Sequence, residues 1–427
     1  MLQTMKNAWR MEDLRKKILF TLFIMLLYRI GAVIPVPFIN VELLKEVFKE
    51  YANGIFGFVN IMSGGAFSQA TLFALSIQPY INASIIINLL SVAIPALERM
   101  VKEGGEEGQK KISAWTRYAT VAIALIMGTA YYITLNSKSL ITVPGIWTAF
   151  VIIFSFTAGS ALIMWLGEQV TENGIGNGIS IILFVSIISR GPSIVTTAVE
   201  SVKNGALNIF GIIGIMILML LIVAFVVFMS NAERRISVQY AKRVVGRKIF
   251  GGQSSYIPLR VNATGVLPVI FASSIVSLPS TIAAFVPNSG ESAFWTGVLN
   301  LFSYKSVFYA VLYFVLIIAF GYFYAAVQFN PIEIANNMRK NGGFIPGLRP
   351  GKPTSDFIAK SMNKITLMGS LFLGVIATLP ILMSSVFNLG NFALGGTSVI
   401  IVVGVALETV KQLEAQMLMR HYKGFLE

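Results

Sequence analysis

The sequence predicts an all-α polytopic membrane protein of about ten transmembrane helices, arranged as two inverted five-helix halves around a central pore. Of its 427 residues, 55% are hydrophobic and 12% are charged, and the mean hydropathy is +0.74. Soluble domains have a more polar composition. The chain also repeats itself: Pro79-Tyr-Ile-Asn-Ala-Ser-Ile-Ile86 is echoed by Pro268-Val-Ile-Phe-Ala-Ser-Ser-Ile275, and Gly178-Ile-Ser-Ile-Ile-Leu183 by Gly396-Thr-Ser-Val-Ile-Ile401. Matches in the same order in opposite parts of the chain indicate a duplicated membrane unit.

The first five spans follow from apolar runs between charged or proline-rich segments. No small-residue cleavage site follows the basic N-terminal segment, which favours a retained first span over a signal peptide. Residues 53–70 are apolar but interrupted by glycines and too short to cross the hydrocarbon core, so we expect a re-entrant half-helix there. The expected spans are Ile18–Pro35, Thr71–Ala96, Thr116–Ile133, Ile146–Leu166 and Ile179–Ile188, with a charged cytosolic turn at Glu98–Lys111.

The second half supplies five more spans, at Ile209–Met229, Val266–Val286, Val307–Val327, Ile365–Phe387 and Val399–Leu407. The fifth and the tenth are unusually short, and short segments at corresponding places in two halves point to a functional centre near the midplane. Because five is odd, the second half must enter the membrane from the opposite side, so the repeat is inverted. The predicted halves are residues 1–200 and 201–427.

The distribution of charge predicts the orientation in the membrane. With the N-terminus in the cytosol, 26 of the 33 Lys and Arg residues lie in cytosolic segments and the rest lie outside. This bias follows the positive-inside rule and predicts that both termini are cytosolic. The chain has no cysteine, and its single histidine, His421, lies in a polar C-terminal tail where a catalytic role is not expected.

Two cytosolic loops, residues 231–260 and 330–364, are longer than a simple connection requires. The first alternates apolar and polar residues around Ile236 and Val238 and again near Tyr256, a pattern that predicts a hairpin. The second begins with a short helical stretch that runs through Lys340. Both loops are rich in basic residues. They either act only as topology determinants or form a docking surface for an acidic or RNA-containing partner.

The predicted spans hold no ionisable residue deep in the membrane. This absence argues against an ion-coupled transporter and an intramembrane enzyme, so we expect no catalytic residue, metal site or cofactor. Six aliphatic residues remain at the duplicated centre: Ile81, Ile85, Leu183, Ile187, Ile270 and Ile401. They could form a ring around a constriction and keep water out of it, or they could be ordinary core residues. Asn82, Ser84, Asn88, Ser273 and Ser274 flank this centre and could equally hold helices together by hydrogen bonds.

Several long motifs resemble those of the bacterial SecY protein-translocation channel family. They are R-I-G-A-V-I-P-V-P from Arg29, S-G-G-A-F-S from Ser63, P-Y-I-N-A-S-I-I-I from Pro79, W-L-G-E-Q-V-T-E-N-G-I-G-N-G-I-S from Trp165, F-N-P from Phe329 and G-L-R-P-G from Gly347. The resemblance extends from the first predicted span to the tenth. It implies a channel that passes unfolded secretory polypeptides across the cytoplasmic membrane and releases transmembrane segments laterally into lipid.

The resemblance also assigns residues and partners. It places the six aliphatic residues in the pore ring, and it places three further groups: Phe58, Asn60, Ser63, Gly64, Gly65 and Phe67 in a plug near residues 58–69; Asn88, Ser273 and Ser274 in a lateral gate; and Arg247, Lys248, Lys340 and Arg349 in loops that bind partners. The implied partners are the small SecE and SecG subunits, the SecA motor ATPase, the ribosome, signal sequences with their nascent chains, and membrane lipid. Since the chain has no nucleotide-binding motif, energy must come from a partner. The alternatives are a secondary transporter with five-plus-five inverted repeats and a membrane-embedded scaffold.

Overall fold

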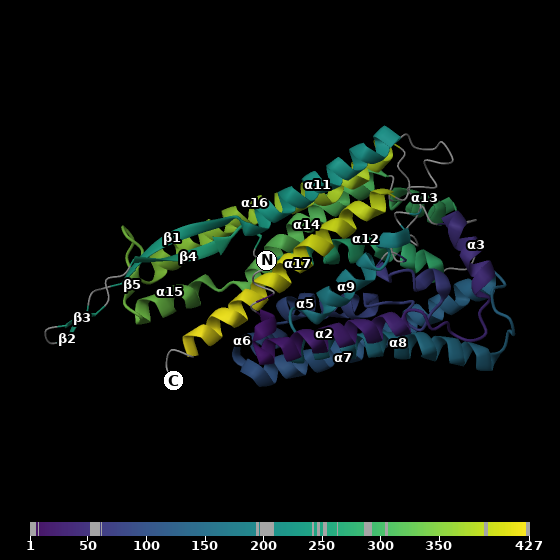
Figure 1. The fold of residues 1–427 in the computed structure, drawn as a ribbon, viewed down its shortest axis with the longest axis horizontal. Helices are drawn as coiled ribbons and strands as arrows, with labels where there is room; N and C mark the ends of the chain where they lie inside the picture. The colour runs from purple at the N-terminus through teal and green to yellow at the C-terminus, as the bar shows by residue number, and fades with distance from the viewer. Residues whose placement is uncertain are drawn as a thin grey trace.

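The computed structural model is an elongated body of packed helices with a small β-sheet at one end (Figure 1). It describes residues 6, 8–51, 60, 62–193, 196, 209–240, 243–245, 248–250, 254–262, 264–285, 293–303, 306–387 and 392–423.

The first half of the chain forms one side of the body. Its helices are α2 (Glu12–Gly31), α3 (Val41–Tyr51), α5 (Gln78–Ala93), α6 (Pro95–Glu103), α7 (Gly105–Ser137), α8 (Ile146–Asn173) and α9 (Gly178–Ile188), with a 3-10 turn, η1 (Phe67–Gln69), before α5. Helix α7 packs between α5 and α8, and α2 lies along α8. The side chain of Asn177 caps α9 by accepting hydrogen bonds from the backbone N–H groups of Ile179 and Ser180.

The second half forms the other side. Its helices are α11 (Ile209–Asn231), α12 (Leu267–Phe285), α13 (Ala293–Leu301), α14 (Val307–Gln328), α15 (Pro331–Lys340), α16 (Lys352–Phe387) and α17 (Phe392–Lys423). Helix α14 packs along α16, and α17 packs against α11 and α16. The two halves meet where α12 touches α5 and α7 and where α17 touches α9. Of these helices, α5, α9, α12 and α17 lie near the middle of the view in Figure 1.

Several helices are apolar enough to cross a membrane. Within the described residues, four stretches qualify singly by length and hydropathy: Gly105–Ser137, Ile146–Asn173, Val307–Lys340 and Lys352–Leu382. A fifth span is formed if Gln78–Ala93 and Pro95–Val101, which are bent by 105°, are taken together, and three shorter apolar helices lie at Gly178–Ser193, Met216–Asn231 and Leu267–Pro279. The helical membrane architecture predicted from composition is therefore confirmed.

Some predicted boundaries are wrong. The second span does not begin at Thr71, because residues 71–77 form turns in which Leu72 N–H bonds to the carbonyl of Ile34, and α5 starts only at Gln78. The charged turn expected at Glu98–Lys111 is instead helical except at Gly104, which separates α6 from α7. Gly105, the first residue of α7, has φ +51°, a left-handed conformation that suits glycine. The tenth segment, expected to be short, belongs to the 32-residue helix α17 because polar residues continue the helix beyond the membrane.

The hairpin predicted for residues 231–260 is confirmed. Strand β1 (Glu233–Tyr240) pairs antiparallel with β4 (Ser254–Arg260), with Ile236 opposite Ile257, and the tip carries β2 (Arg243–Val245) and β3 (Lys248–Phe250). The second long loop contributes β5 (Gly343–Phe344), which pairs with the other edge of β1, so the sheet order is β4-β1-β5. The predicted helical stretch through Lys340 is α15. A separate apolar core, including Ile236, Val238 and Ile358, joins the sheet to α15 and α16.

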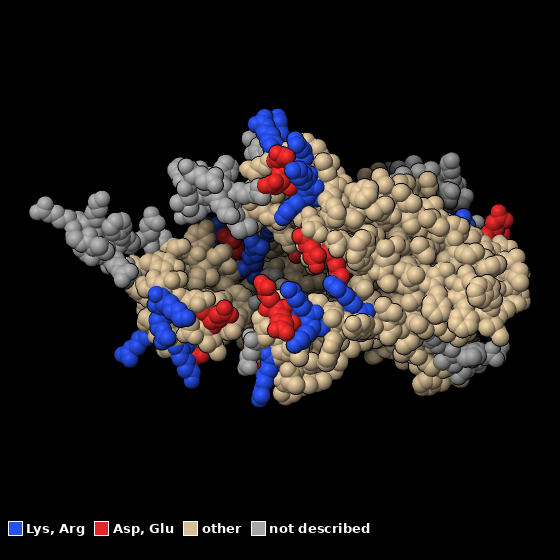
Figure 2. Space-filling view, turned by 90° about the horizontal axis from the view of Figure 1, so that it is seen from below, with Lys and Arg blue, Asp and Glu red and all other residues tan. Residues whose placement is uncertain are grey.

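Charged side chains gather at the end of the molecule that carries this sheet. Figure 2 shows most of the Lys, Arg, Asp and Glu residues of the viewed face around a hollow and over the lobe beside it, whereas the opposite half is almost uncharged. A body with one charged end and a long uncharged flank suits a protein held in a bilayer with its two long loops in water.

Candidate functional site

The six aliphatic residues predicted at the duplicated centre all lie in one buried core cluster. They come from four helices: Ile81 and Ile85 from α5, Leu183 and Ile187 from α9, Ile270 from α12 and Ile401 from α17. Their exposed fractions range from 0% for Leu183 to 7% for Ile187. Four helices from both halves therefore each contribute aliphatic side chains to this cluster.

Part of the predicted plug segment packs directly into this cluster. Met62, which sequence reasoning did not single out, is 1% exposed and belongs to the same core. Its carbonyl accepts a hydrogen bond from Ser76 Oγ at 3.3 Å, and its sulfur accepts one from Gln78 Nε2 at 3.2 Å. Since Gln78 begins α5, the segment is tied to the helix that carries Ile81 and Ile85. Ser76 has φ +53°, a strained conformation for a residue with a side chain.

Gly64 of the predicted plug lies against the C-terminal end of α9. A Cβ at this position would come within 2.8 Å of Ser189 Oγ and 2.9 Å of the Ser186 carbonyl oxygen, and the glycine has φ +67°, so a larger residue would push the segment away. Ser186 is itself held by a buried hydrogen bond of 2.6 Å with Tyr28 of α2. The contact point of Gly64 is therefore a fixed surface formed by α2 and α9.

The C-terminal end of the plug segment is held by α7. The Tyr131 hydroxyl donates a 2.6 Å hydrogen bond to the carbonyl of Phe67, and the two rings stack with centroids 4.6 Å apart. Phe156 of α8 lies against the other side, with its ring centroid 5.0 Å from that of Tyr131. Sequence reasoning identified Phe67 but missed Tyr131, because a tyrosine within an apolar span carries no signal that distinguishes an anchor from ordinary packing.

The remaining predicted plug residues form a compact turn. Asn60 accepts a hydrogen bond from Ser68 N–H through Oδ1 at 3.0 Å, and its carbonyl accepts one from Gly65 N–H at 2.8 Å. The Ser63 hydroxyl accepts a hydrogen bond from Phe67 N–H at 3.1 Å. Within the described part of this segment, Asn60 and Met62 are helical and residues 63–70 form turns that include the 3-10 turn η1. Residues 53–59 and 61 of the predicted half-helix lie outside the described residues, so that prediction stays open. Phe58 lies outside the described residues.

Of the predicted lateral-gate residues, Asn88 lies on α5, and Ser273 and Ser274 lie on α12. Their side chains differ in the hydrogen bonds that they make. Asn88 Nδ2 donates to Ser84 Oγ at 3.3 Å on its own helix and to Tyr324 OH of α14 at 3.4 Å across the boundary between the halves. Tyr324 also packs on Phe271 of α12, with ring centroids 5.1 Å apart. Sequence reasoning missed Tyr324.

The two serines of α12 make no such bond across the boundary. Ser273 is buried and donates back to the Ile270 carbonyl at 2.7 Å, whereas the buried Ser274 Oγ has no hydrogen-bond partner. The bond from Asn88 to Tyr324 is long, so it opposes opening of this junction only weakly.

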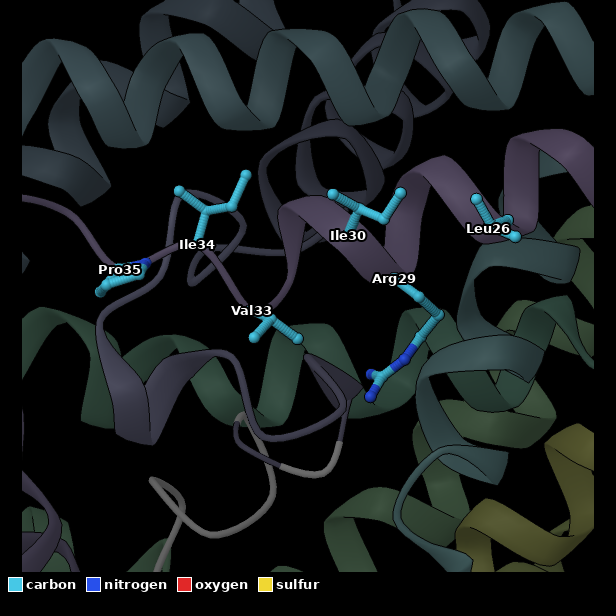
Figure 3. Close-up of a pocket in the computed structure, with 6 residues that line it drawn as sticks. All are labelled: Leu26, Arg29, Ile30, Val33, Ile34 and Pro35. Atoms are coloured by element: carbon cyan, nitrogen blue, oxygen red, sulfur yellow. The ribbon is translucent and has the colours of Figure 1, made fainter.

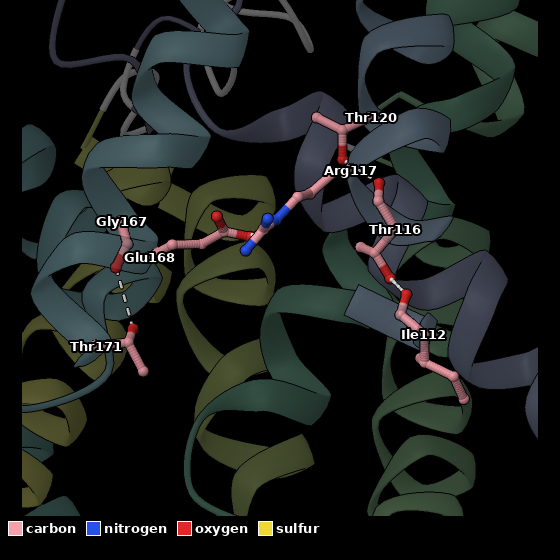
Figure 4. Close-up of polar contacts among 7 residues, drawn as sticks. All are labelled: Ile112, Thr116, Arg117, Thr120, Gly167, Glu168 and Thr171. Atoms are coloured by element: carbon pink, nitrogen blue, oxygen red, sulfur yellow. Dashed lines mark hydrogen bonds and ion pairs between the residues drawn. The ribbon is translucent and has the colours of Figure 1, made fainter. Parts of the chain in front are cut away.

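A charged pair braces the first half beside this junction. Arg117 Nε of α7 donates to Glu168 Oε1 of α8 at 2.9 Å, as Figure 4 shows. The Glu168 side chain is only 18% exposed, compared with 49% for Arg117. Hydroxyls on the same two helices bond within them, from Thr116 to Ile112 and from Thr171 to Gly167. The pair ties α7 to α8, which supports treating them as one rigid unit.

Two of the four predicted partner-binding residues can be placed on the charged end. Lys340 is the exposed last residue of α15, and Arg349 is exposed in the loop between β5 and α16. Gly347 (φ +82°) and Gly351 (φ +108°) set the course of that loop, and the Arg349 carbonyl accepts a hydrogen bond from Thr354 at 2.8 Å. Lys248 lies in β3 at the hairpin tip, and Arg247 lies outside the described residues. The described residues contain no group of side chains that could hold a metal ion.

Comparison with known proteins gives a consistent family. A family model described as SecY matches residues 71–410. The protein translocase subunit SecY of Streptomyces coelicolor is 46% identical over 446 residues, covering 100% of both chains, and that of Mycobacterium tuberculosis is 42% identical over 447 residues with the same coverage.

Solved structures agree on the fold. One described as "The structure of a protein conducting channel" superposes with a TM-score of 0.65 at 20% identity, covering 94% of this chain and 92% of that one. Sec61 in a canine ribosome-channel complex gives a TM-score of 0.59 at 19% identity, with the same coverage.

Proposed function

The chain belongs to the SecY family, and from this premise we propose that it is the channel subunit of a protein translocase, which passes unfolded secretory polypeptides across the cytoplasmic membrane. The observation that carries the proposal is the buried aliphatic centre built from α5, α9, α12 and α17. Aliphatic side chains make no specific polar demand, so they can close around chains of any sequence. A dry constriction also resists the passage of ions.

In this proposal, Ile81, Ile85, Leu183, Ile187, Ile270 and Ile401 form the pore ring. The plug comprises residues near 58–69, and Gly64 against α9 and Phe67 on Tyr131 hold it closed. Opening moves the Asn60–Ala66 part away, while the Tyr131 contact keeps its C-terminal end in place. Leu183 is the only leucine among the isoleucines of the ring, a volume-conserving difference that preserves the seal.

The apolar junction between α5 and α12 serves as the lateral gate. Asn88, Ser273 and Ser274 lie along it, and the 3.4 Å hydrogen bond from Asn88 to Tyr324 that crosses the boundary is easily broken. When the halves separate there, an apolar segment of about 20 residues can leave the pore and partition into lipid.

The charged end faces the cytosol, where Arg247, Lys248, Lys340 and Arg349 bind the partner that supplies energy. Among the relatives by fold, the canine channel is described in complex with a ribosome, and basic loops suit RNA as well as an acidic motor. We therefore assign the ribosome and a SecA-type motor to this end, small SecE- and SecG-type subunits to the lipid-facing flanks, and both termini to the cytosol.

Site-specific crosslinking tests the proposal. A photoreactive residue at position 270 would be challenged with a stalled secretory chain in reconstituted membranes that contain the motor. The expected result is a crosslink that forms only when the chain carries a signal sequence. A photoreactive residue at Phe150, which is 55% exposed on the outside of α8, serves as the control and should not crosslink. Solute uptake without any crosslink at position 270 would instead favour a secondary transporter.

A further inference from the structure

Two arginines at the outer ends of α2 and α9 belong to no interaction that the channel proposal uses. In the proposed orientation both helices run outward, and Arg29 and Arg190 lie near their outer ends, on the side of the membrane that holds only seven of the 33 basic residues. Within the described residues, neither guanidinium has an ion-pair or hydrogen-bond partner. Positive charges are scarce on this side of the membrane. Two arginines without a partner there are therefore candidates to bind an anion.

Both arginines follow closely, along the chain, the residues through which α2 and α9 are joined. Arg29 directly follows Tyr28, and Arg190 follows Ser186 by four residues; Tyr28 and Ser186 share the buried 2.6 Å hydrogen bond between α2 and α9. Arg190 is half-buried. An anion bound beside it would offset the cost of removing that charge from water.

The surface next to Arg29 is an apolar groove of about 610 Å³. Its apolar lining residues are all exposed: Leu26 (56%), Ile30 (51%), Val33 (61%) and Ile34 (50%), with Pro35 at the end of the groove. Figure 3 shows the Arg29 side chain extending away from Ile30 and Ile34, so the charge borders the groove rather than filling it. A hydrocarbon surface with a positive charge at its outer edge matches an acyl chain with a phosphate above it.

We propose that this groove binds one phospholipid of the outer leaflet, with an acyl chain along α2 and the phosphodiester held by Arg29 and Arg190. Arginine suits this role because its guanidinium forms charge-assisted, bidentate hydrogen bonds with phosphate oxygens. Two arginines favour a headgroup with a net negative charge over a zwitterionic one. The lipid would rest on the α2–α9 contact against which Gly64 packs. The inference uses the proposed orientation in the membrane but not the translocation activity.

The probe is phosphatidylglycerol with a photoactivatable acyl chain, in vesicles that contain the intact complex. The expected result for the unsubstituted protein is crosslinking to residues 26–35. Arg29→Gln should lower the yield about tenfold, the effect of losing one charge-assisted hydrogen bond, while Arg29→Lys should retain part of it. Arg190→Gln should also lower the yield. The matched control is Lys45→Gln, which removes an exposed charge from α3 on the same side of the membrane.

Competition separates the possible sources of the anion. Unlabelled phosphatidylglycerol should displace the probe, whereas phosphatidylcholine should do so less well and inorganic phosphate not at all. An unchanged yield in Arg29→Gln, or an equal loss in Lys45→Gln, would overturn the site. Displacement by inorganic phosphate alone would reassign it to a free anion. Protection of residues 26–35 by a protein subunit of the complex, with no lipid crosslink, would reassign the groove to that subunit. Because no polypeptide is translocated in this assay, its failure is distinguishable from failure of the channel proposal.

Discussion

At the scale of single residues, the central feature is that six aliphatic side chains from both halves lie in one buried cluster. Ile81 of α5 and Ile270 of α12 are 2% and 1% exposed, and they occupy equivalent places in the internal repeat. The sequence predicted this pairing because a repeat reveals positions that share a role. It could not predict the burial, which depends on the contacts α12 makes with α5 and α17 makes with α9.

We expect the double substitution Ile81→Asn and Ile270→Asn to make the resting channel leak ions. An amide in the ring would hold water in a constriction that hydrocarbon keeps dry. The measurement is single-channel conductance of the reconstituted complex without substrate, with Ile81→Leu and Ile270→Leu as the volume-conserving control. A well-expressed double Asn variant with the conductance of the control would remove these residues from the ring.

Tyr131 gives a second prediction at this scale. Removing its hydroxyl in Tyr131→Phe leaves the ring stacked on Phe67 but takes away the 2.6 Å hydrogen bond to the Phe67 carbonyl. That carbonyl keeps the bond from Ala70 N–H, so the expected loss in the free energy of unfolding is about 1 kcal/mol.

Because the lost hydrogen bond anchors the plug, the Tyr131→Phe variant should also show more frequent brief openings in the absence of substrate. Thermal unfolding and conductance recordings measure the two effects. The neighbouring Tyr132→Phe is the matched control, since Tyr132 is only half-buried. Equal opening frequencies in the two variants would show that Tyr131 packs without anchoring.

At the scale of elements, the predictable features were those that depend on neighbouring residues in the sequence. The alternation around Ile236 and Val238 predicted β1, and Pro331 after the capping Asn330 marks the start of α15. Residues 71–77 were predicted as helix because they are apolar, and that was wrong. The N–H groups of Thr71 and Leu72 bond instead to the carbonyls of Ala66 and Ile34, and those of Ala74 and Ser76 close local turns. Apolar composition indicates burial in the membrane, but it does not determine whether a backbone N–H group bonds within a helix or to a residue elsewhere in the chain.

The loop between β5 and α16 should bind the energy-supplying partner through Arg349. Its shape is set by Gly347, Gly351 and the bond from Thr354 to the Arg349 carbonyl, none of which needs the arginine side chain. Arg349→Glu should therefore leave the unfolding temperature unchanged while it lowers motor- or ribosome-driven translocation about tenfold or more, since it replaces a contact charge by its opposite. The control is Lys45→Glu, the same reversal on the opposite side of the membrane. Normal translocation by the well-expressed Arg349 variant would exclude that role.

At the scale of the whole molecule, the packing suggests two units joined along narrow contacts. Within the first half, α7 is packed against α5 and α8 and braced by Arg117 with Glu168. Within the second half, α14 lies along α16. The odd number of spans in each half and the repeat predict an inverted arrangement. Which helices touch across the junction was not predictable, because a sequence of this kind marks lipid-facing and protein-facing surfaces with the same apolar residues.

This arrangement predicts that opening separates the halves as rigid bodies. The absence of cysteine allows spin labels to be placed at chosen pairs. Tyr118 on α7 is 75% exposed and Met368 on α16 is 65% exposed, so cysteines there carry labels on opposite halves without disturbing the core. The distance between them, measured by pulsed electron paramagnetic resonance, should lengthen when a ribosome with a signal-bearing nascent chain is added. The pair Tyr118 and Phe150, both in the first half, should keep its distance, because α7 and α8 move together. If both distances changed alike, the first half would deform internally instead of moving as a rigid body. The Arg117–Glu168 pair would then not hold α7 and α8 together, and the predicted plug, which contacts α7 and α9, would lose its fixed support.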